Sequence, residues 1–329
     1  MQIETMNMRI SIFAAAGLLL LGTLSARAQE SADNGVLPFL GLATDARTAG
    51  LAGAGSTLGD NASAIYGNAA SALTGDKKAG IGLFTGPWTS DFKSSDVLLG
   101  ASGYYNIGGK NGILAGFRRI AGPDIELTDD LGLPAGTTHS SEWTLDLGYG
   151  HLFADRWAVA VTAHYVHSDL GFDDASNGVM FGLHAAYKGS FRRPDAGRWS
   201  VGLSLLDCGP ELKVGNANYP LPMRLRLGGS VDRRFNRNHE LAAALDLNYQ
   251  LQPEGIFAAS LGAEYTFLRH GVVRAGYCVS SAMNNSGNYG TIGCGVLVGP
   301  ARIDFAYRFG GGEHNPLNRT IHLSAAVLF

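Results

Sequence analysis

Long segments of this chain alternate apolar and polar residues with a period of two. In residues 256–268, Leu261 and Tyr265 are apolar positions, and Ser260 and Glu264 stand between such positions. A period of two places successive side chains on opposite faces of a β-strand, so each segment would have one apolar and one polar face. No segment beyond the first thirty residues offers the roughly 20 apolar residues that a membrane-spanning helix needs. If the mature chain lies in a membrane, strands must carry it across.

Fourteen segments show this alternation, and an even number is typical of a bacterial single-chain barrel. The predicted fold is all-β: a transmembrane antiparallel β-barrel of about fourteen strands, with a small plug-like N-terminal segment. The alternative that the aromatic residues leave open is an ordinary β-sandwich core. The predicted strands cover residues 79–88, 96–107, 111–120, 141–153, 155–167, 178–190, 198–207, 221–232, 239–250, 256–268, 271–281, 288–298, 300–309 and 320–329.

The connections between the predicted strands fall into two alternating sets. If both chain ends lie in the periplasm, the inner set includes the very short turns at 154–155, 269–270 and 299–300 and somewhat longer ones at 192–197 and 233–239. Short periplasmic turns alternating with longer outer loops are expected of such barrels. The longest outer loops are 121–140 and 208–219. Charge divides in the same way: the inner turns carry Arg192, Arg193, Arg198, Arg233, Arg234 and Arg237, and the first long loop carries Asp124, Glu126, Asp129 and Asp130.

Composition agrees with this fold class and excludes some partners. The chain has 46 glycines in 329 residues, about twice the usual roughly 7%, and only 16% charged residues, below the usual quarter. A net charge of −3 gives no basic field, so nucleic acid is not an expected partner. Cys208, Cys278 and Cys294 lack the spacing of metal ligands, and Cys278 and Cys294 are expected on opposite faces of neighbouring strands, which argues against a disulfide.

Both ends of the chain carry signals of export. Residues 1–28 are predicted to be a cleaved signal peptide, with an apolar run at 10–22 and the small-x-small sequence Ala26-Arg27-Ala28. The predicted domains are this peptide, an N-terminal segment or plug at 29–77, and the barrel at 78–329. The final alternating strand ends on Phe329, which we interpret as a signal for the barrel-assembly machinery. The expected location is the outer membrane of a Gram-negative bacterium.

Aromatic residues gather near the ends of the predicted strands, as expected for the girdles that lie at the level of the lipid headgroups. The residues concerned are Trp88, Trp143, Trp157, Trp199, Tyr249 and Phe309.

The segment at 29–77 is rich in glycine and alanine, so we expect a short helix and turns inside the barrel mouth. Its motif residues are Asp45, Arg47, Gly50, Gly53, Asn61 and Asn68. With Thr85-Gly86-Pro87-Trp88, Asp146-Leu147-Gly148-Tyr149-Gly150 and Leu221-Pro222-Met223-Arg224-Leu225, they make the sequence similar to the PorV/PorQ family. These are FadL-like outer-membrane barrels associated with the type IX secretion system of Bacteroidetes. The chain departs from the family at Gly67-Asn68-Ala69-Ala70, where members usually show Trp-Asn-Pro-Ala, and this leaves open a paralogue with an altered role.

The resemblance implies a non-enzymatic part in protein export. The expected partners are the type IX translocon, attachment-complex proteins and the C-terminal signal domains of cargo, besides outer-membrane lipid and the barrel-assembly machinery. Contacts with cargo would come from the loops at 121–140, 169–177 and 208–219. The alternative function is a FadL-like transporter of hydrophobic small molecules, with a pocket under the N-terminal segment lined by Phe39, Leu40, Leu42 and Ile65.

No catalytic constellation, cofactor site or metal site is predicted. Gly202-Leu203-Ser204 lacks the last glycine of a nucleophile elbow, and His164 and His167 would point to opposite faces of one strand. One polar set is expected to face the lumen, either as a conduit or as mixed charges that cross-link strands in a filled interior. It comprises Asp146, His164, Arg224, Arg226, Asp246, Glu264, Arg274, Arg302, Asp304 and Arg308.

Overall fold

The computed structural model describes residues 37–89, 97–128, 133–171, 174–192, 197–252, 255–281, 288–311 and 317–329. Residues 1–36, which include the whole of the predicted signal peptide, lie outside the described residues. Among the described residues, no helix is long and apolar enough to cross a membrane.

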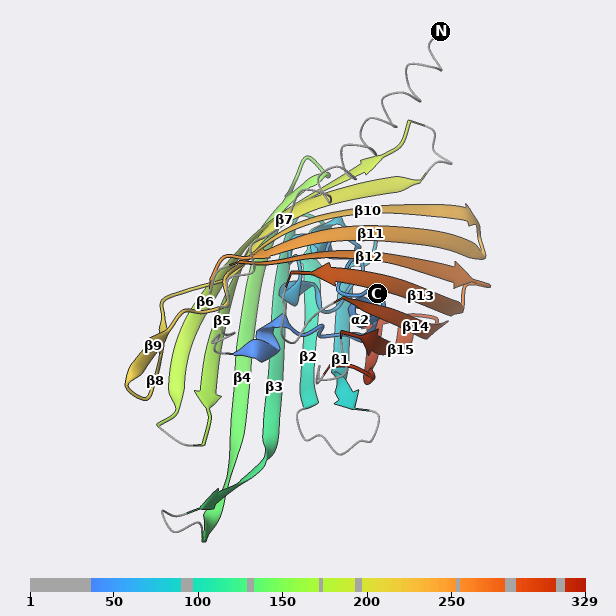
Figure 1. The fold of residues 1–329 in the computed structure, drawn as a ribbon. Coiled ribbons are helices and arrows are strands. Elements are labelled where there is room, and N and C mark those ends of the chain that lie inside the picture. The colour runs from blue at the N-terminus through green and yellow to red at the C-terminus, as the bar shows by residue number, and fades with distance from the viewer. Residues whose placement is uncertain are drawn as a thin grey trace. The chain divides into compact units, whose positions relative to one another are not determined.

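Fourteen strands of the described chain close into one antiparallel barrel, which confirms the predicted fold class (Figure 1). Each strand pairs with its neighbours along the chain, apart from β7 and β10, which pair across an inserted two-stranded hairpin. The wall consists of β1 (Ala79–Thr89), β2 (Val97–Ile107), β3 (Asn111–Thr128), β4 (Pro134–Phe153), β5 (Trp157–Asp169), β6 (Ser176–Ser190), β7 (Arg198–Cys208), β10 (Arg224–Asn236), β11 (His239–Gln250), β12 (Ile256–Phe267), β13 (Gly271–Ser280), β14 (Tyr289–Val298), β15 (Ala301–Gly310) and β16 (Thr320–Leu328).

The barrel closes where β1 meets β16. The pairing runs from Gly80 opposite Leu328 to Thr89 opposite Thr320. Phe329 continues it, because its N–H donates to the Ala79 carbonyl at 2.8 Å and its own carbonyl accepts from the backbone of the linker before β1. The wall therefore has no free edge at this seam, and a closed wall leaves no unpaired row of backbone groups in lipid.

The two faces of the wall match the predicted alternation. On β12, Leu261 is 60% exposed on the outside, whereas Ser260 and Glu264 are buried on the inside. Similarly, on β4 Leu147 is exposed and Asp146 is fully buried. The cysteines follow the same rule: Cys278 is buried, Cys294 is exposed, and neither forms a disulfide. An apolar exterior around a polar interior is the arrangement that lipid requires of a barrel.

Aromatic side chains cluster on the outside at both ends of the wall. Toward one end, the Trp143 ring lies 5.2 Å from the ring of His167 and 5.6 Å from that of Tyr165. Toward the other end, Tyr187 lies between Trp157 and Trp199, at 4.6 Å and 5.2 Å between ring centroids. These clusters agree with the predicted girdles; the Trp88 side chain lies outside the described residues.

The end of the wall with the short turns is called the inner end here, because short turns face the periplasm in outer-membrane barrels. The first residues of β1 and the last residues of β16 lie at this end. The turn predicted at 233–239 is wrong in length, since β10 continues as far as Asn236 and carries Arg233 and Arg234. The extended part is polar, and it is stabilised by the ion pair between Arg234 on β10 and Glu240 opposite it on β11.

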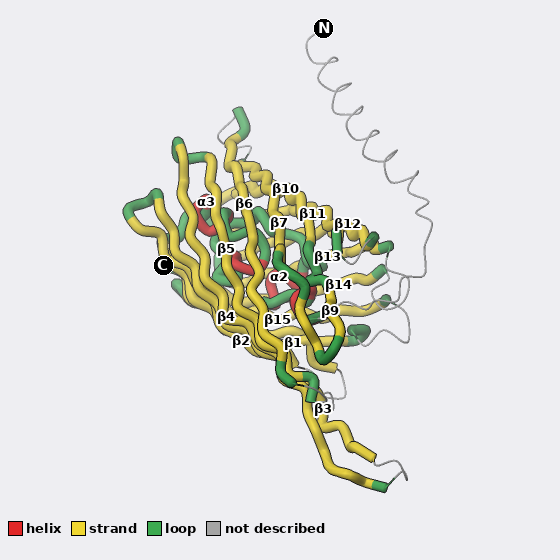
Figure 2. The backbone as a smooth tube through the Cα atoms, turned by 90° about the vertical axis from the view of Figure 1, so that its left-hand side faces the viewer, coloured by secondary structure: helices red, strands yellow, loops and turns green. Residues whose placement is uncertain are grey.

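Two predicted outer loops also contain strands. Most of the predicted loop 121–140 belongs to β3 and β4, which pair with each other beyond Ala121 and Ser141, where neither neighbouring strand reaches them. Figures 1 and 2 show this extension, here called the outer hairpin, running beyond the other strands. Its polar sequence lacks the apolar alternation, and among the described strands each of its two strands pairs only with the other there. The predicted loop 208–219 contains β8 (Leu212–Val214) and β9 (Ala217–Tyr219), which pair together.

The N-terminal segment forms short helices and turns, as predicted. These are η1 (Pro38–Gly41), α2 (Ala46–Gly50), η2 (Ala64–Tyr66) and α3 (Ser71–Thr74). In Figure 2 they lie inside the ring of strands. The helix α2 contacts β13 to β16, whereas η2 and α3 contact β2 to β6, so the segment crosses the lumen from one side of the wall to the other. Small residues make this possible: Ala46, Ala64, Ala69, Ala70 and Ala72 are all buried against the wall.

Candidate functional site

The helix α2 begins at a capping residue that also holds a second part of the N-terminal segment. The Asp45 carboxylate accepts from the N–H of Thr48 at 2.9 Å and from its hydroxyl at 2.9 Å. Such a cap satisfies donors that the first turn leaves without partners. The amide of Asn61 also donates to Asp45, at 3.4 Å. Two of the motif residues predicted from sequence therefore meet at the start of α2.

Gly50 and Gly53 lie where α2 packs on the wall. Gly50 faces Gly293 on β14, and a Cβ on Gly293 would lie 3.3 Å from the Gly50 Cα, so glycine in the wall lets α2 approach it closely. The Gly50 carbonyl accepts from the Thr291 hydroxyl at 2.9 Å. Gly53 has a φ of +85°, in the left-handed region that residues with side chains rarely adopt.

Arg47 joins the N-terminal segment to a cluster of charges on the wall. Its guanidinium donates to both carboxylate oxygens of Glu264 on β12, at 3.0 and 3.1 Å. Glu264 also accepts from Arg274 at 2.5 Å and from Arg302 at 3.0 Å, and Arg302 donates to Asp304 at 2.5 Å. We call these five residues the arginine cluster. Burial alone would lower the pKa of Arg47, but the charge and hydrogen bonds of Glu264, together with the charges of Asp304 and Asp45, outweigh burial and raise that pKa. The side chain therefore stays charged.

A second buried polar group lies on the opposite side of the lumen. Asp146 accepts from the Tyr66 hydroxyl of η2 at 2.8 Å, and its other oxygen lies 2.6 Å from His164 Nδ1. Burial first, and then the charge of Asp146, raises the pKa of Tyr66, so the phenol keeps its proton and remains a donor. From His164 the contacts continue through Thr162 and His184 to Ser204, in steps of 2.9, 3.2 and 3.1 Å. The chain links β4 to β7.

This second group includes residues that the sequence did not point to. Tyr66, Thr162, His184 and Ser204 were not among the predicted lumen residues. Thr162, His184 and Ser204 occupy inward positions of their strands. The period of two in the sequence could therefore have identified them as lumen residues. His164 is buried in the lumen, whereas His167 stacks on Trp143 outside, as predicted.

The side chains of Asn68 and Asp246 form hydrogen bonds with backbone groups and so join the N-terminal segment to the wall. The Asn68 side chain donates to the Ala185 carbonyl on β6 at 3.0 Å and accepts from the N–H of Ala70 at 3.1 Å. Asp246 on β11 accepts from the N–H of Ser56 at 3.0 Å. Each fixes the N-terminal segment to a different strand, so the lumen polar residues act at several places and do not converge on one centre.

An outer cavity of about 520 Å³ lies between the N-terminal segment and the outer end of the wall. Apolar residues of the segment, Leu37, Leu40 and Leu42 among them, line one part of it. Arg224, Arg226 and Arg308 line another part, and these are the remaining predicted lumen residues. Arg224 donates to the Leu40 carbonyl at 2.9 Å and to Asp207, and the Arg308 guanidinium lies 3.6 Å from the centre of the Tyr289 ring.

Of the predicted apolar pocket, Phe39, Leu40 and Leu42 do line this cavity. Ile65 is fully buried among other residues and is not part of the lining.

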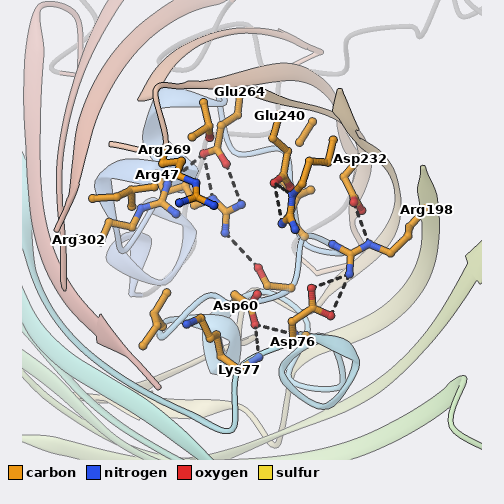
Figure 3. Close-up of a pocket in the computed structure, with 18 of the residues that line it drawn as sticks. Arg47, Asp60, Asp76, Lys77, Arg198, Asp232, Glu240, Glu264, Arg269 and Arg302 are labelled. Carbon is orange, nitrogen blue, oxygen red and sulfur yellow. Dashed lines mark hydrogen bonds and ion pairs between the residues drawn. The ribbon is translucent and has the colours of Figure 1, made fainter. Parts of the chain in front are cut away.

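An inner cavity of about 490 Å³ lies on the other side of the N-terminal segment, at the periplasmic mouth. Charged side chains dominate its lining, as Figure 3 shows. Asp76, between α3 and β1, pairs there with Arg198 at 2.6 Å and with Lys188 at 3.1 Å. Partial burial would raise the pKa of Asp76, but the hydrogen bonds from Arg198 and Lys188 outweigh burial and lower it.

Within the described part of the chain, no group of three or more histidine, cysteine or acidic side chains is placed to hold a metal ion. The arrangement instead holds a segment in a lumen and leaves one cavity at each mouth. Such an arrangement can bind molecules at either mouth and exclude others from the lumen.

Comparisons with known proteins agree with this architecture. The Ralstonia pickettii toluene transporter TbuX is 14% identical, with a TM-score of 0.54 over 86% of this chain and 96% of that one. A Pseudomonas aeruginosa FadL homologue is also 14% identical, with a TM-score of 0.53 over 86% of this chain and 98% of that one. The CymD monoaromatic hydrocarbon channel is 15% identical, with a TM-score of 0.53 over 87% and 97%. At these identities the likeness establishes the fold.

No curated protein matches the sequence. The sequence profile of the type IX secretion system protein PorV matches residues 25–256, which is more than two thirds of the chain. With the fourteen-stranded wall and its apolar exterior, this match places the protein in the outer membrane. The chain belongs to the PorV family of type IX secretion system proteins.

Proposed function

We propose that this protein is a plugged outer-membrane scaffold of type IX secretion, and that its outer surface binds cargo or attachment-complex proteins. Membership of the PorV family supports the pathway. The outer hairpin carries the proposal further, because among the described strands each of its two strands pairs only with the other beyond Ala121 and Ser141. The segment after β5 contacts it at one point, where the Thr138 hydroxyl donates to the Gly171 carbonyl at 2.9 Å. An unpaired strand edge offers backbone donors and acceptors to a strand of another protein.

The scaffold role also fits the filled lumen. The N-terminal segment is fixed to the wall through Arg47 and Glu264, through Asn68 and through Asp246. A rigid wall supports loops that act as a binding surface. A substrate polypeptide would therefore contact the outer end of the barrel and would not pass through its interior.

The first experiment is affinity purification of the tagged protein from native outer membranes, followed by mass spectrometry. We expect proteins with a shared C-terminal β-domain, or a large translocon barrel, to be recovered with it. A variant in which an Asn-Gly turn replaces residues 124–139 removes the outer hairpin and leaves the wall intact. We expect this variant to lose the partners while its unheated electrophoretic mobility, which reports barrel folding, stays unchanged. Recovery of the same partners with both proteins would contradict a role for the hairpin.

A second candidate function is transport of a hydrophobic small molecule. The outer cavity favours it, because apolar residues of the N-terminal segment line a space of about 520 Å³, within the usual range for ligand pockets. Extraction of the purified protein with organic solvent, followed by mass spectrometry, separates the two functions. A barrel recovered alone with a stoichiometric lipid or fatty acid would favour transport over the scaffold.

A further inference from the structure

The inner cavity has more positive than negative charge. Eight lysine or arginine side chains line it, against five carboxylates, so three positive charges are in excess. The cavity is bordered by the linker between α3 and β1, by the β10–β11 turn and by the β12–β13 turn (Figure 3). None of the type IX partners considered above would reach it from outside the cell, since it opens at the opposite end from the outer hairpin.

The carboxylates of this cavity already have partners. Asp76 and Asp232 both accept from Arg198, and Glu240 accepts from Arg234 at 3.0 Å. Glu264 is shared within the arginine cluster. Asp60 accepts from two backbone N–H groups of the linker, at 2.9 and 2.8 Å. These contacts hold the N-terminal segment and the turns in place, and they leave no carboxylate for further cations.

The cations that remain are Lys77, Arg237 and Arg269. All three are exposed, and among the described residues none has a carboxylate within ion-pair distance. Arg269 donates to the Arg237 carbonyl at 2.8 Å through Nε, which fixes the two turns next to each other. Three elements thus present uncompensated positive charge toward one water-filled space. A cavity lined by surplus cations focuses the electrostatic field and raises the local concentration of anions.

We propose that the inner cavity docks an acidic peptide segment of a periplasmic protein. The cations come from three separate elements, which suits an extended chain with several carboxylates better than a single small anion. They line the inside of the mouth, whereas phospholipid headgroups lie around the outside of the wall. Guanidinium and ammonium groups form charge-assisted hydrogen bonds with carboxylates, and this is the contact that an Asp- or Glu-rich segment would make. The proposal does not depend on the function of the outer hairpin.

The test measures binding of a fluorescein-labelled deca-glutamate peptide to the purified full-length barrel in detergent by fluorescence anisotropy. A deca-lysine peptide is the comparison. We expect deca-glutamate to bind and deca-lysine not to bind, and we expect affinity to fall steeply between 50 and 300 mM salt, because exposed charges are screened.

Two matched triple variants locate the site. Lys77→Gln, Arg237→Gln and Arg269→Gln remove the surplus cations from the cavity. Lys110→Gln, Arg156→Gln and Arg192→Gln remove the same charge from exposed positions at the same end of the barrel that do not line the cavity. Loss of three exposed ion pairs should weaken binding about tenfold in the first variant, and the second should stay within about twofold of the natural protein. Unheated electrophoretic mobility checks that both variants are folded.

Three results would overturn the proposal. Equal weakening in the two triple variants would show a general charge effect of the periplasmic end. Displacement of the peptide by millimolar inorganic phosphate alone would identify a small-anion site. Binding of phosphatidylglycerol vesicles that the cavity variant abolishes, without binding of deca-glutamate, would identify a lipid contact.

Discussion

At the scale of single residues, Glu264 connects the N-terminal segment to the wall. It accepts hydrogen bonds from arginines on α2, β13 and β15, and its side chain is 9% exposed. Buried charges of this kind are tolerated when their partners are present and costly when one partner is removed. The motif residue Arg47 therefore depends on a carboxylate more than two hundred positions away in the sequence.

Replacing Glu264 with glutamine should lower the free energy of unfolding by about 3 kcal/mol, because three buried arginines lose their shared carboxylate. Urea unfolding of the detergent-solubilised barrel, followed by tryptophan fluorescence, measures this. Glu240→Gln is the matched control, since its partner Arg234 is 65% exposed, and it should cost less than about 1 kcal/mol. Equal losses in the two variants would show that Glu264 does not anchor the segment.

Asp76 makes a pH-dependent contribution to the stability of the folded protein. The pKa of this carboxyl is lowered from its ordinary value of 3.8 by Arg198 and Lys188, against the opposing effect of partial burial. A lowered folded-state pKa means that the stabilisation is present above the ordinary pKa and is lost as the pH falls through the folded-state value. The difference in urea midpoint between the natural protein and Asp76→Asn should thus be constant from pH 7 to 5 and shrink below pH 4. A difference that grows in acid would contradict the ion pairs.

At the scale of secondary structure elements, glycines on the wall set how closely the N-terminal segment approaches. Gly262 and Gly276 lie opposite each other on β12 and β13, under the turn after α2. A Cβ on Gly276 would lie 2.4 Å from the carbonyl carbon of Leu51. Since that neighbour is backbone, it cannot move aside as a flexible side chain would.

Gly276→Ala should therefore destabilise the barrel by about 1–3 kcal/mol, the usual cost of overpacking. The same urea assay measures it. Gly229→Ala on β10 is the control, because the nearest atom to a Cβ there is a backbone oxygen at 3.9 Å. Should Gly276→Ala be as stable as the control, the segment would not press on the wall at this point.

The sequence predicted the wall well and the contacts inside it poorly. Strand positions follow from an alternation that lipid on one side and the lumen on the other impose on every residue. The outer hairpin escaped prediction because only one partner strand, and no apolar environment, constrains its sequence. Which lumen residues meet could not be read from spacing: Tyr66 and Asp146 are eighty positions apart, and only closure of the barrel brings them to 2.8 Å.

At the scale of the whole molecule, the N-terminal segment should keep the lumen closed to ions. An empty barrel of this size is wide enough to hold water. Reconstituted in planar bilayers, the natural protein should show no steady conductance, and a variant lacking residues 37–74 should open a pore. Steady conductance of the natural protein, equal to that of the deletion variant, would contradict a closed lumen.

The seam between β1 and β16 has a consequence for the order of assembly. The strand that completes the wall, β16, comes after every other wall strand in the chain, whereas the segment that lies innermost precedes them all. A chain that stops before residue 320 leaves two open sheet edges and an interior with nothing to enclose it. Because β1 finds its second partner only in β16, closure of the wall waits for the strand that is most distant from it in the sequence.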